Sequence, residues 1–546
     1  MKFQIHQITL LVVLLISFNG YNQTIKTEKP KLVVGIIVDQ MREEYLVRYQ
    51  NKFSDKGFKR IMNNGYVFKN AHYNYIPTKT APGHASVYTG TTPKFHGIIS
   101  NSWYHKDIKK DENCVFDGSV ETIGSSSVNG QRSPHKMLAS TITDELQLSS
   151  QGRSKVIGIS LKDRGAILPA GHMADAAYWY DDTDGHFISS TYYMDALPDW
   201  VQKYNKANHV NKHLKTDWTT FLPIALYTES TTDQQVYETV FPHKKDSKFP
   251  YEYKSLSNKE RYEILPETPY GNTIVAELAM EAIEHEHLGQ GDETDFLAIS
   301  FSSTDKIGHA FGPYSIEVED TYLRLDQDLA QLMEKLDSKV GKDNYTLFLT
   351  ADHAASDVSL YLKEQKIPTG TYHPEEVMAQ VQNKLTSIYN LEGMIEAISG
   401  DQLFLNHELI SSKELDFNAV LNVCKKELMK IPGVFEVILR PDLERFEYTT
   451  EEKGMVQRGY HIQRSGDVVI LFNPAWSSFR EYGTGHGSGY SYDTHVPMLW
   501  YGRNIPKGSS VARKSITDIS PTLTIMLGLK FPNATTGAVI PELFEH

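Results

Sequence analysis

The sequence is poor in cysteine. Cys114 and Cys424 are the only two cysteines among 546 residues, and they lie far apart in the chain. Their spacing excludes a C-x-x-C metal motif. Two unpaired buried thiols are the interpretation we favour, and a single disulfide is the alternative. In either case the fold must be stabilised mainly by its hydrophobic core.

The sequence also lacks runs of basic residues. With 55 Lys and Arg against 68 Asp and Glu, the net charge is −13. An acidic chain without basic clusters argues against nucleic acid as a partner. An anionic substrate remains compatible with this charge, because a bound metal ion can reverse the local field.

Beyond the N-terminus, the sequence has no apolar run long enough to cross a bilayer. Residues 1–23 have the pattern of a signal peptide: Lys2 is followed by an apolar stretch from Ile8 to Phe18, and cleavage is expected near Gln23. The stretch is short for a membrane span, although an uncleaved anchor is the alternative. We therefore expect a periplasmic or secreted protein without stable membrane insertion.

Strand-like apolar runs alternate with helical segments along the chain, which predicts an α/β fold with a mostly parallel central sheet flanked by helices. An amphipathic helix is expected from Val318 to Leu336. We interpret 24–546 as one catalytic domain with inserted cap segments near 174–270 and 357–480. The buried strands are expected at 31–39, 155–161, 295–301 and 345–353.

Three of the expected strands lead into side chains that can bind a metal ion. They are Asp39, the pair Asp305 and His309, and the pair Asp352 and His353. Each alone could be a helix cap or a surface loop residue. Parallel strands end at the same edge of a sheet, so their convergence is harder to explain by chance. Carboxylate and imidazole ligands suit Zn²⁺, and we expect Gly308 to allow a bend in a loop holding Asp305 and His309.

Other polar residues have the properties of a catalytic site. Thr80 is expected at the start of a helix with Pro82 in its first turn, where the helix dipole favours an alkoxide or a bound phosphate; the alternative is a capping threonine. Asn101 lies in a loop. Lys162 and Arg164 follow a strand at alternate positions and could face one pocket, or be solvated surface charges.

Taken together, the motifs resemble the alkaline phosphatase superfamily, and most closely the PafA-type periplasmic alkaline phosphatases of flavobacteria. The resemblance covers nearly the whole chain. It implies two zinc ions per chain. The matching stretches include Val38-Asp39, Thr78-Lys79-Thr80-Ala81, Thr304-Asp305-x-x-Gly308-His309, Asp352-His353 and the late His486. By this resemblance one zinc ion is held by Asp305, His309 and His486, and the other by Asp39, Asp352 and His353, with Thr80 beside it.

The resemblance further implies a phosphate monoester hydrolase of broad specificity that forms a phospho-threonine at Thr80. Asn101, Lys162 and Arg164 would hold the phosphoryl oxygens. The expected partners are small-molecule phosphate monoesters, and the expected state is a monomer. The chain departs from the family pattern at Lys79, where relatives carry an apolar residue, and in the glycine-rich loop around His486.

A phosphodiesterase or nucleotide pyrophosphatase of the same superfamily is the main alternative, since it would share the metal ligands, Thr80 and Asn101. A phosphodiesterase would have less need of Lys162 and Arg164 as cations that bind phosphoryl oxygens. A sulfatase is disfavoured because the sequence lacks the Cys/Ser-x-Pro-x-Arg motif that is converted to formylglycine. A metal-stabilised binding protein without activity is disfavoured by the intact Thr80.

Overall fold

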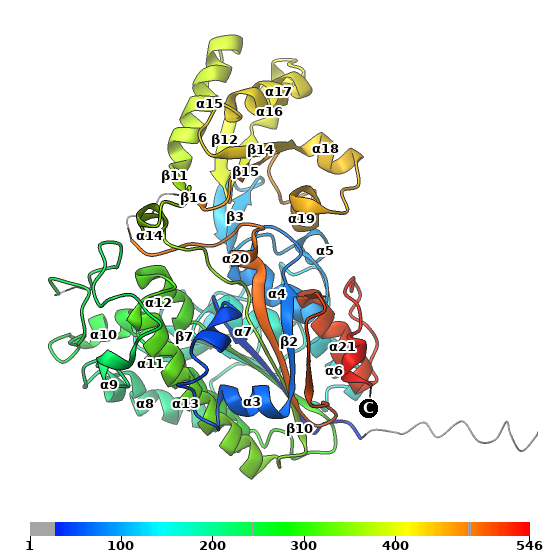
Figure 1. Cartoon of the computed structure of the whole chain (residues 1–546). Helices are drawn as coiled ribbons and strands as arrows, with labels where there is room; N and C mark the ends of the chain where they lie inside the picture. The colour runs from blue at the N-terminus through cyan, green and yellow to red at the C-terminus, as the bar shows by residue number, and fades with distance from the viewer. Residues whose placement is uncertain (1–27, 243, 479, 481, 546) are drawn as a thin grey trace, which may run out of the picture.

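The computed structural model describes residues 28–242, 244–478, 480 and 482–545. The predicted signal peptide, residues 1–23, lies outside the described residues. A large sheet of eleven strands runs through the lower part of the molecule, and a smaller four-stranded sheet lies above it (Figure 1).

Five neighbouring parallel strands form the centre of the large sheet, in the order β10-β1-β9-β6-β7. Every residue of these strands is buried, as expected for a sheet covered on both faces. This confirms the predicted parallel sheet. The strands are β1 (Leu32–Val38), β6 (Val156–Ser160), β7 (Ala176–Asp181), β9 (Asp295–Phe301) and β10 (Tyr345–Thr350).

Further strands extend the sheet at both ends, mainly through antiparallel pairs. Beside β10 lies β17 (His495–Gly502), followed by β2 (Tyr66–His72), and two short strands pair with β2: β18 (Gly508–Ser510) and β19 (Lys514–Ser515). At the other end β8 (His186–Ser190) pairs with β7, and β5 (Thr122–Ile123) with β8.

The segment 174–270, which we expected to be an inserted cap, begins inside the large sheet, because β7 and β8 belong to it. The rest of the segment has little regular structure apart from short helices. These are α8 (Asp199–Lys206), α9 (His209–His213), η1 (Ile224–Leu226), α10 (Asn258–Ile264) and η2 (Leu265–Glu267).

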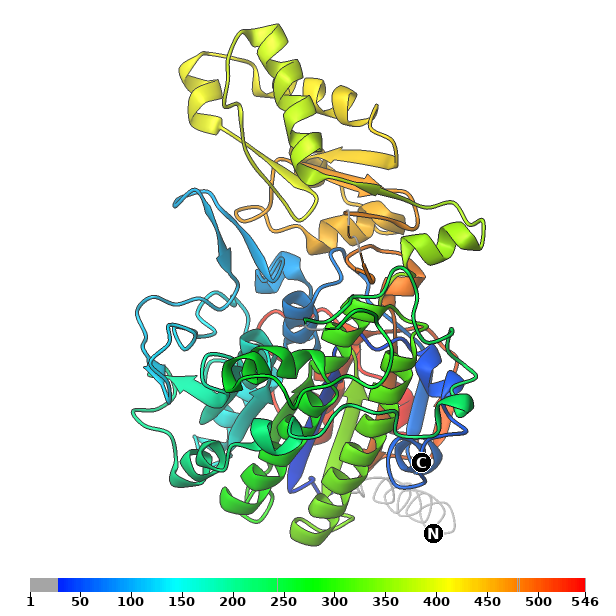
Figure 2. The same cartoon turned by 90° about the vertical axis from the view of Figure 1, so that its left-hand side faces the viewer.

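Helices cover both faces of the large sheet (Figures 1 and 2). The predicted amphipathic helix is α13 (Ile316–Lys339), whose Leu325, Leu329, Leu332 and Leu336 are fully buried. It packs with α3 (Phe58–Asn64), α11 (Tyr270–His285) and α12 (Ser303–Phe311) on one face. The opposite face carries α4 (Thr80–Thr89), α6 (Ile142–Ser150), α7 (Asp163–Ala170) and α21 (Ile519–Leu527).

The smaller sheet has a hydrophobic core of its own. Its antiparallel strands follow the order β12-β13-β15-β14, and buried side chains such as Val381, Leu421 and Val437 join the strands to two helices. The elements are β12 (Ile395–Ser399), β13 (Gln402–Leu405), β14 (Val434–Leu439), β15 (Val468–Phe472), α15 (Pro374–Tyr389) and α17 (Phe417–Leu428). All of them lie within the segment 357–480.

Shorter elements surround each of the two sheets. Around the large sheet they are α2 (Glu44–Arg48), α5 (Pro93–His96), the paired strands β3 (Ser102–His105) and β4 (Lys110–Asn113), α20 (Ser491–Thr494), η3 (Ile516–Asp518) and η4 (Pro541–Leu543). Around the smaller sheet they are α14 (Ser359–Glu364), β11 (Gly370–Tyr372), α16 (His407–Ser412), α18 (Arg440–Arg445), α19 (Glu451–Gly459) and β16 (Trp476–Ser478).

Both cysteines are free and buried. Cys114 packs among apolar side chains of α4 and α7, and Cys424 lies in α17 within the core of the smaller sheet. The interpretation as two unpaired thiols is therefore confirmed.

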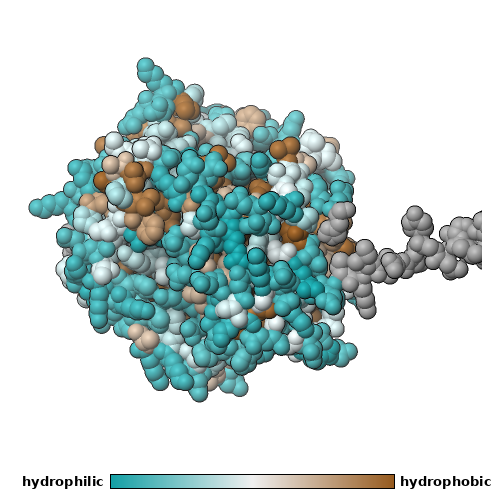
Figure 3. Space-filling view, turned by 60° about the horizontal axis from the view of Figure 1, so that its bottom comes forward, coloured by the Kyte–Doolittle hydropathy of each residue, from teal (hydrophilic) through white to brown (hydrophobic). Residues whose placement is uncertain are grey.

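In the part of the chain that the structure describes, no helix is both long and apolar enough to cross a membrane. The face shown in Figure 3 is mainly hydrophilic, with hydrophobic side chains in scattered patches.

Candidate metal centre and catalytic site

Three neighbouring strands bring the predicted ligands to one edge of the large sheet. Asp352 follows β10, Asp39 follows β1, and Asp305 follows β9, and these strands are adjacent in the order β10-β1-β9. The Asp39 amide donates to the carbonyl of Phe301, which ties the ends of β1 and β9 together. The predicted convergence of the strand ends is confirmed.

The first group of possible ligands consists of Asp39, Asp352 and His353, which offer ligand atoms within 4.8 Å of one another. His353 Nε2 lies 3.5 Å from Asp39 Oδ1 and 3.6 Å from Asp352 Oδ2. All three side chains are completely buried.

A second group contains Asp305, His353 and His486, again within 4.8 Å of one another. His353 is shared by the two groups, and its ring stacks on that of His486 with centroids 3.5 Å apart. His309, which the family resemblance assigned here, also lies close, with its Nε2 3.1 Å from Asp305 Oδ1.

Backbone carbonyls orient the three imidazoles. The Nδ1 atoms of His309, His353 and His486 each lie 2.8 Å from a carbonyl oxygen, those of Thr484, Ala354 and Thr78 respectively. A carbonyl can only accept, so Nδ1 carries the proton in each ring. The Nε2 lone pairs are therefore directed toward the carboxylates, as in histidines that bind metal ions.

Two further observations indicate that the first group of ligands suits a divalent cation. Asp39 Oδ1, Asp352 Oδ2 and His353 Nε2 are buried and have no hydrogen-bond partner, although buried polar atoms are normally satisfied. Burial, followed by the nearby Asp39 carboxylate, raises the pKa of Asp352 well above its ordinary value. Carboxylates packed so closely favour a cation between them.

One predicted feature of the site is wrong. Asp305 and His309 do not lie in a loop bent at Gly308, because they occupy positions one turn apart in helix α12. That spacing places both side chains on one face of the helix. Gly308 has a different role: a Cβ atom there would lie 1.9 Å from Oε1 of Gln40.

Gln40 is a residue of the site that the sequence did not reveal. Its Nε2 donates to Asp305 Oδ1 at 2.8 Å, and its backbone amide donates to Asp352 Oδ1 at 3.2 Å. It thus connects carboxylates of the two ligand groups. Its φ of 65° lies in the left-handed region, which is uncommon for a residue other than glycine.

Thr80 begins helix α4, as predicted, and Pro82 lies in its first turn. Lys162 Nζ lies 3.4 Å from Thr80 Oγ1 and also contacts Asp39 Oδ2 at 2.6 Å and Asp305 Oδ2 at 2.7 Å. Although burial opposes the charge, Asp305 and Asp39 raise the pKa of Lys162. The solvated alternative for Lys162 is therefore excluded.

Asn101 and Arg164 border the same region. Asn101 Oδ1 accepts a hydrogen bond from the amide of Ala81 at 2.8 Å. The Nδ2 amino group of Asn101 takes no part in that bond. Arg164 is within hydrogen-bond distance of Asp163 Oδ1, 3.4 Å away, and its Nε is buried without a partner. A buried guanidinium nitrogen without an acceptor fits an anionic ligand.

Two more residues that the sequence did not reveal hold the backbone of this site. His84 Nδ1 donates to the Thr80 carbonyl at 2.8 Å, and its Nε2 lies 2.8 Å from Ser300 Oγ. Burial lowers the pKa of His84 to about 4. Thr304 donates to the Asp39 carbonyl at 2.6 Å. Thr304 belongs to one of the stretches that carry the family resemblance, and His84 follows another, but neither residue type alone indicates these contacts.

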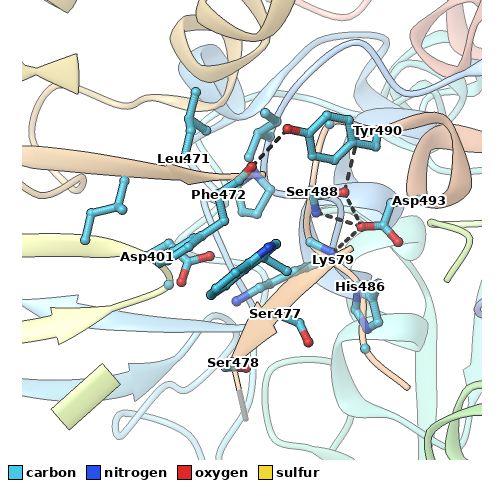
Figure 4. Close-up of a pocket in the computed structure, with 18 of the residues that line it drawn as sticks. Lys79, Asp401, Leu471, Phe472, Ser477, Ser478, His486, Ser488, Tyr490 and Asp493 are labelled. Atoms are coloured by element: carbon cyan, nitrogen blue, oxygen red, sulfur yellow. Dashed lines mark hydrogen bonds between the residues drawn. The ribbon is translucent and has the colours of Figure 1, made fainter. Parts of the chain in front are cut away.

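A cavity opens beside the ligands, between the large sheet and the smaller one (Figure 4). Lys79 and His486 line it from the large sheet, and Asp401 lines it from the smaller one. The rings of Tyr372 and Phe472 stack with centroids 3.8 Å apart on its wall. Burial lowers the pKa of Lys79, and Asp493 holds the His486 loop by accepting from the amides of residues 487 and 488.

Comparison with known proteins gives a consistent result. A family model described as type I phosphodiesterase/nucleotide pyrophosphatase matches residues 33–496. The chain therefore belongs to this family, a branch of the alkaline phosphatase superfamily.

Individual relatives match over nearly the whole chain. Alkaline phosphatase PafA of Elizabethkingia meningoseptica is 40% identical over 98% of this chain and 98% of its own. Alkaline phosphatase PhoV of Synechococcus elongatus is 41% identical over 100% of both chains. A Myroides odoratus protein named calcium-transporting ATPase is 41% identical over 95% of this chain and 96% of its own.

The crystal structure of wild-type PafA is similar with a TM-score of 0.91, 40% identity, and coverage of 94% of this chain and 99% of that one. The predicted family and the predicted α/β fold are thus both confirmed. The chain is an enzyme of the PafA and PhoV group.

Proposed function

We propose that this enzyme hydrolyses phosphate monoesters through a covalent phospho-threonine at Thr80, with two zinc ions per chain. The observation that carries the proposal is the Lys162 ammonium, which lies 3.4 Å from Thr80 Oγ1 and contacts both Asp39 and Asp305. One cation thereby links the hydroxyl of the nucleophile to carboxylates of both ligand groups.

The residues of the chain have distinct tasks in this proposal. Thr80 Oγ loses its proton and attacks phosphorus, while the bond from phosphorus to the ester oxygen breaks and the alcohol leaves after taking up a proton. Water then hydrolyses the phospho-threonine, which releases phosphate and restores the Thr80 hydroxyl. The helix dipole of α4 favours the negative charge that develops at its N-terminus. The Asn101 amino group donates to one phosphoryl oxygen. Lys162 neutralises charge as a compact ammonium, and Arg164 donates through its planar guanidinium. The solved four-residue variant of PafA replaces a threonine, an asparagine, a lysine and an arginine, which are the same four residue types.

The metal ions would be held by two ligand sets. Asp39, Asp352 and His353 would hold one, and Asp305, His309 and His486 the other. Two zinc ions, when bound, stabilise the attacking and leaving oxygens of an in-line displacement. The unpartnered oxygens of Asp39 and Asp352 and the unpartnered Nε2 of His353 support this assignment.

The leaving group would enter the cavity in Figure 4. The residues proposed to grip the phosphoryl group come from the large sheet and its helices, so we expect broad specificity for small-molecule phosphate monoesters. We further propose export to the periplasm or the medium after removal of residues 1–23. The proposed protein acts as a monomer, without a nucleic-acid partner and without stable membrane insertion.

A phosphodiesterase is the second candidate, favoured by the family description that matches residues 33–496. Parallel assays of an aryl phosphate monoester, its methyl diester, an aryl sulfate and ATP distinguish these functions. A preference for the monoester supports the proposal. A preference for the diester would replace it, and selective ATP turnover would point instead to the activity named for the Myroides odoratus relative.

We expect close to two tightly held zinc ions per chain after dialysis against zinc-free buffer, because two ligand sets are present and one of them is completely buried. Elemental analysis measures this content. Chelation should abolish monoester hydrolysis, and added zinc should restore it. Full activity in protein shown to be free of metal would contradict the assignment.

Gly308→Ala should lower monoester kcat/KM by about 10- to 100-fold, the range found when residues that orient metal ligands are changed. The added Cβ would lie 1.9 Å from Gln40 Oε1, so Gln40 must move and its hydrogen bond to Asp305 is lost. Gly291→Ala is the matched control, because nothing lies within 4 Å of a Cβ there. Equal activities of the two variants in folded protein would show that Gln40 does not position Asp305.

A further inference from the structure

A third group of ligand-type side chains lies on the outside of the molecule, away from the large sheet's ligand edge. His209 and His213 are the first and last residues of the short helix α9, and Glu277 lies in α11. Their ligand atoms are within 4.8 Å of one another. The two helices pack side by side (Figure 1).

The geometry of the group is close to that of a metal site. His209 Nδ1 lies 2.8 Å from Glu277 Oε2, and His213 Nε2 lies 3.1 Å from Glu277 Oε1. Tetrahedral zinc with bonds of about 2.0–2.1 Å separates its ligand atoms by about 3.3 Å. The two His–Glu distances are therefore within about half an ångström of that separation.

Neighbouring aromatic rings fix the orientation of both imidazoles. The His209 ring stacks on Tyr204 with centroids 3.9 Å apart and an angle of 8° between the planes. The His213 ring stacks on Tyr270 at 5.7 Å and 14°. The Tyr204 hydroxyl, which donates to the Ile274 carbonyl at 3.0 Å, also lies 3.2 Å from Glu277 Oε2. Such outer contacts preorganise ligands and are typical of built metal sites.

The three side chains remain accessible. Their side-chain exposures are 19% for His209, 18% for His213 and 22% for Glu277, so an ion can enter from solvent and keep a water molecule as an additional ligand. The i, i+4 spacing of two histidines, joined by a carboxylate from another helix, is also the ligand pattern of zinc peptidases.

We propose that His209, His213 and Glu277 bind a zinc ion that is separate from the proposed catalytic pair. The residue after His209 is Val210, so the glutamate that serves as base in H-E-x-x-H enzymes is missing. The site is therefore structural: the ion would link α9, which belongs to a segment with little regular structure, to α11, which packs on the sheet. This proposal does not depend on the proposed function.

The test counts zinc in the full-length protein and its variants after equilibration at a defined micromolar free zinc concentration. The double variant His209→Ala/His213→Ala should hold one equivalent less than the wild type. His285→Ala is the matched control. His285 lies on the same helix α11 and contacts Glu281 at 3.1 Å. Among the described residues, His285 belongs to no group of three possible metal ligands. The zinc content of the His285→Ala variant should therefore equal that of the wild type.

Two further measurements keep the test decisive if the double variant folds poorly. Glu277→Gln keeps a hydrogen-bonding side chain between the imidazoles but removes the anionic ligand, and it should also hold one equivalent less. Diffraction data collected at the zinc absorption edge should give a peak between the three side chains. Monoester hydrolysis should be unchanged in all three variants. Equal zinc contents in wild type and Glu277→Gln, or no peak, would show a hydrogen-bonded network without a metal ion and overturn the proposal.

Discussion

Thr80→Ala should lower monoester turnover by about three orders of magnitude or more, the scale seen when a covalent nucleophile is removed. The substitution removes the hydroxyl oxygen that lies 3.4 Å from Lys162 Nζ. It leaves every proposed zinc ligand in place. Steady-state kinetics measure the loss, and elemental analysis should show that the zinc content is unchanged.

The control variants are Thr78→Ala and Ser86→Ala, which remove nearby hydroxyl groups with other partners. Thr78 Oγ1 donates to the Ser488 carbonyl, and Ser86 Oγ contacts His96 Nε2. Both variants should retain most of the turnover. Rapid acid quenching followed by peptide mass spectrometry should find phosphate on Thr80. A phosphorylated Thr78 or Ser86 would refute the assignment of the nucleophile.

Replacing Lys162 and Arg164 together with alanine should lower monoester kcat/KM by about two to four orders of magnitude. Hydrogen bonds to charged groups are worth roughly 1.5–3 kcal/mol each, and each 1.36 kcal/mol is about tenfold in rate. A monoester dianion has one more charged oxygen than a diester, whose alkylated oxygen cannot serve both cations. Diester hydrolysis should therefore change far less.

The measurement compares an aryl monoester with its methyl diester in wild type and in Lys162→Ala/Arg164→Ala. Because Lys162 contacts Asp39 and Asp305, the zinc content is measured in parallel. Arg164→Ala alone, which leaves those contacts intact, should show part of the same preference. Lys306→Ala, which removes an exposed lysine next to Asp305, controls for the loss of one positive charge. Equal losses on both substrates would show that the pair does not distinguish them.

The sequence predicted which residues meet at the site better than it predicted the helices and strands around them. Buried parallel strands are continuous apolar runs, and a carboxylate directly after such a run marks the ligand edge of a sheet. For this reason the sequence alone predicts that Asp39, Asp305 and Asp352 lie close together. These signals are local, so they need no knowledge of distant contacts.

The sequence did not predict helix α12, because Gly308 in its interior disfavours a helix in isolation. Packing against α13 stabilises it instead, since tertiary contacts can override local preference. Strands β7 and β8 were missed for a related reason. Their aromatic residues, such as Trp179, resembled the irregular segment that follows, and only the pairing of β7 with β6 identifies them as part of the sheet.

Gln40 could not be predicted at all from one sequence. Its hydrogen bonds reach Asp305 and Asp352, which are far away along the chain. Neither the residue type nor its spacing indicates these partners. The close approach of Gln40 to Gly308 becomes visible only when the turn after β1 and helix α12 are seen together.

The smaller sheet has a practical consequence for how the enzyme can change. It has its own hydrophobic core, and it supplies Asp401 and Phe472 to the cavity wall, where Tyr372 of the neighbouring strand β11 stacks on Phe472. Thr80 and the proposed ligands lie instead on helices and loops at the edge of the large sheet. If the proposed function holds, mutations between residues 395 and 472 should therefore change the preference for the alcohol that is released and leave the proposed catalytic residues unaltered. A library confined to this segment is the natural starting point for evolving new substrate selectivity in the laboratory.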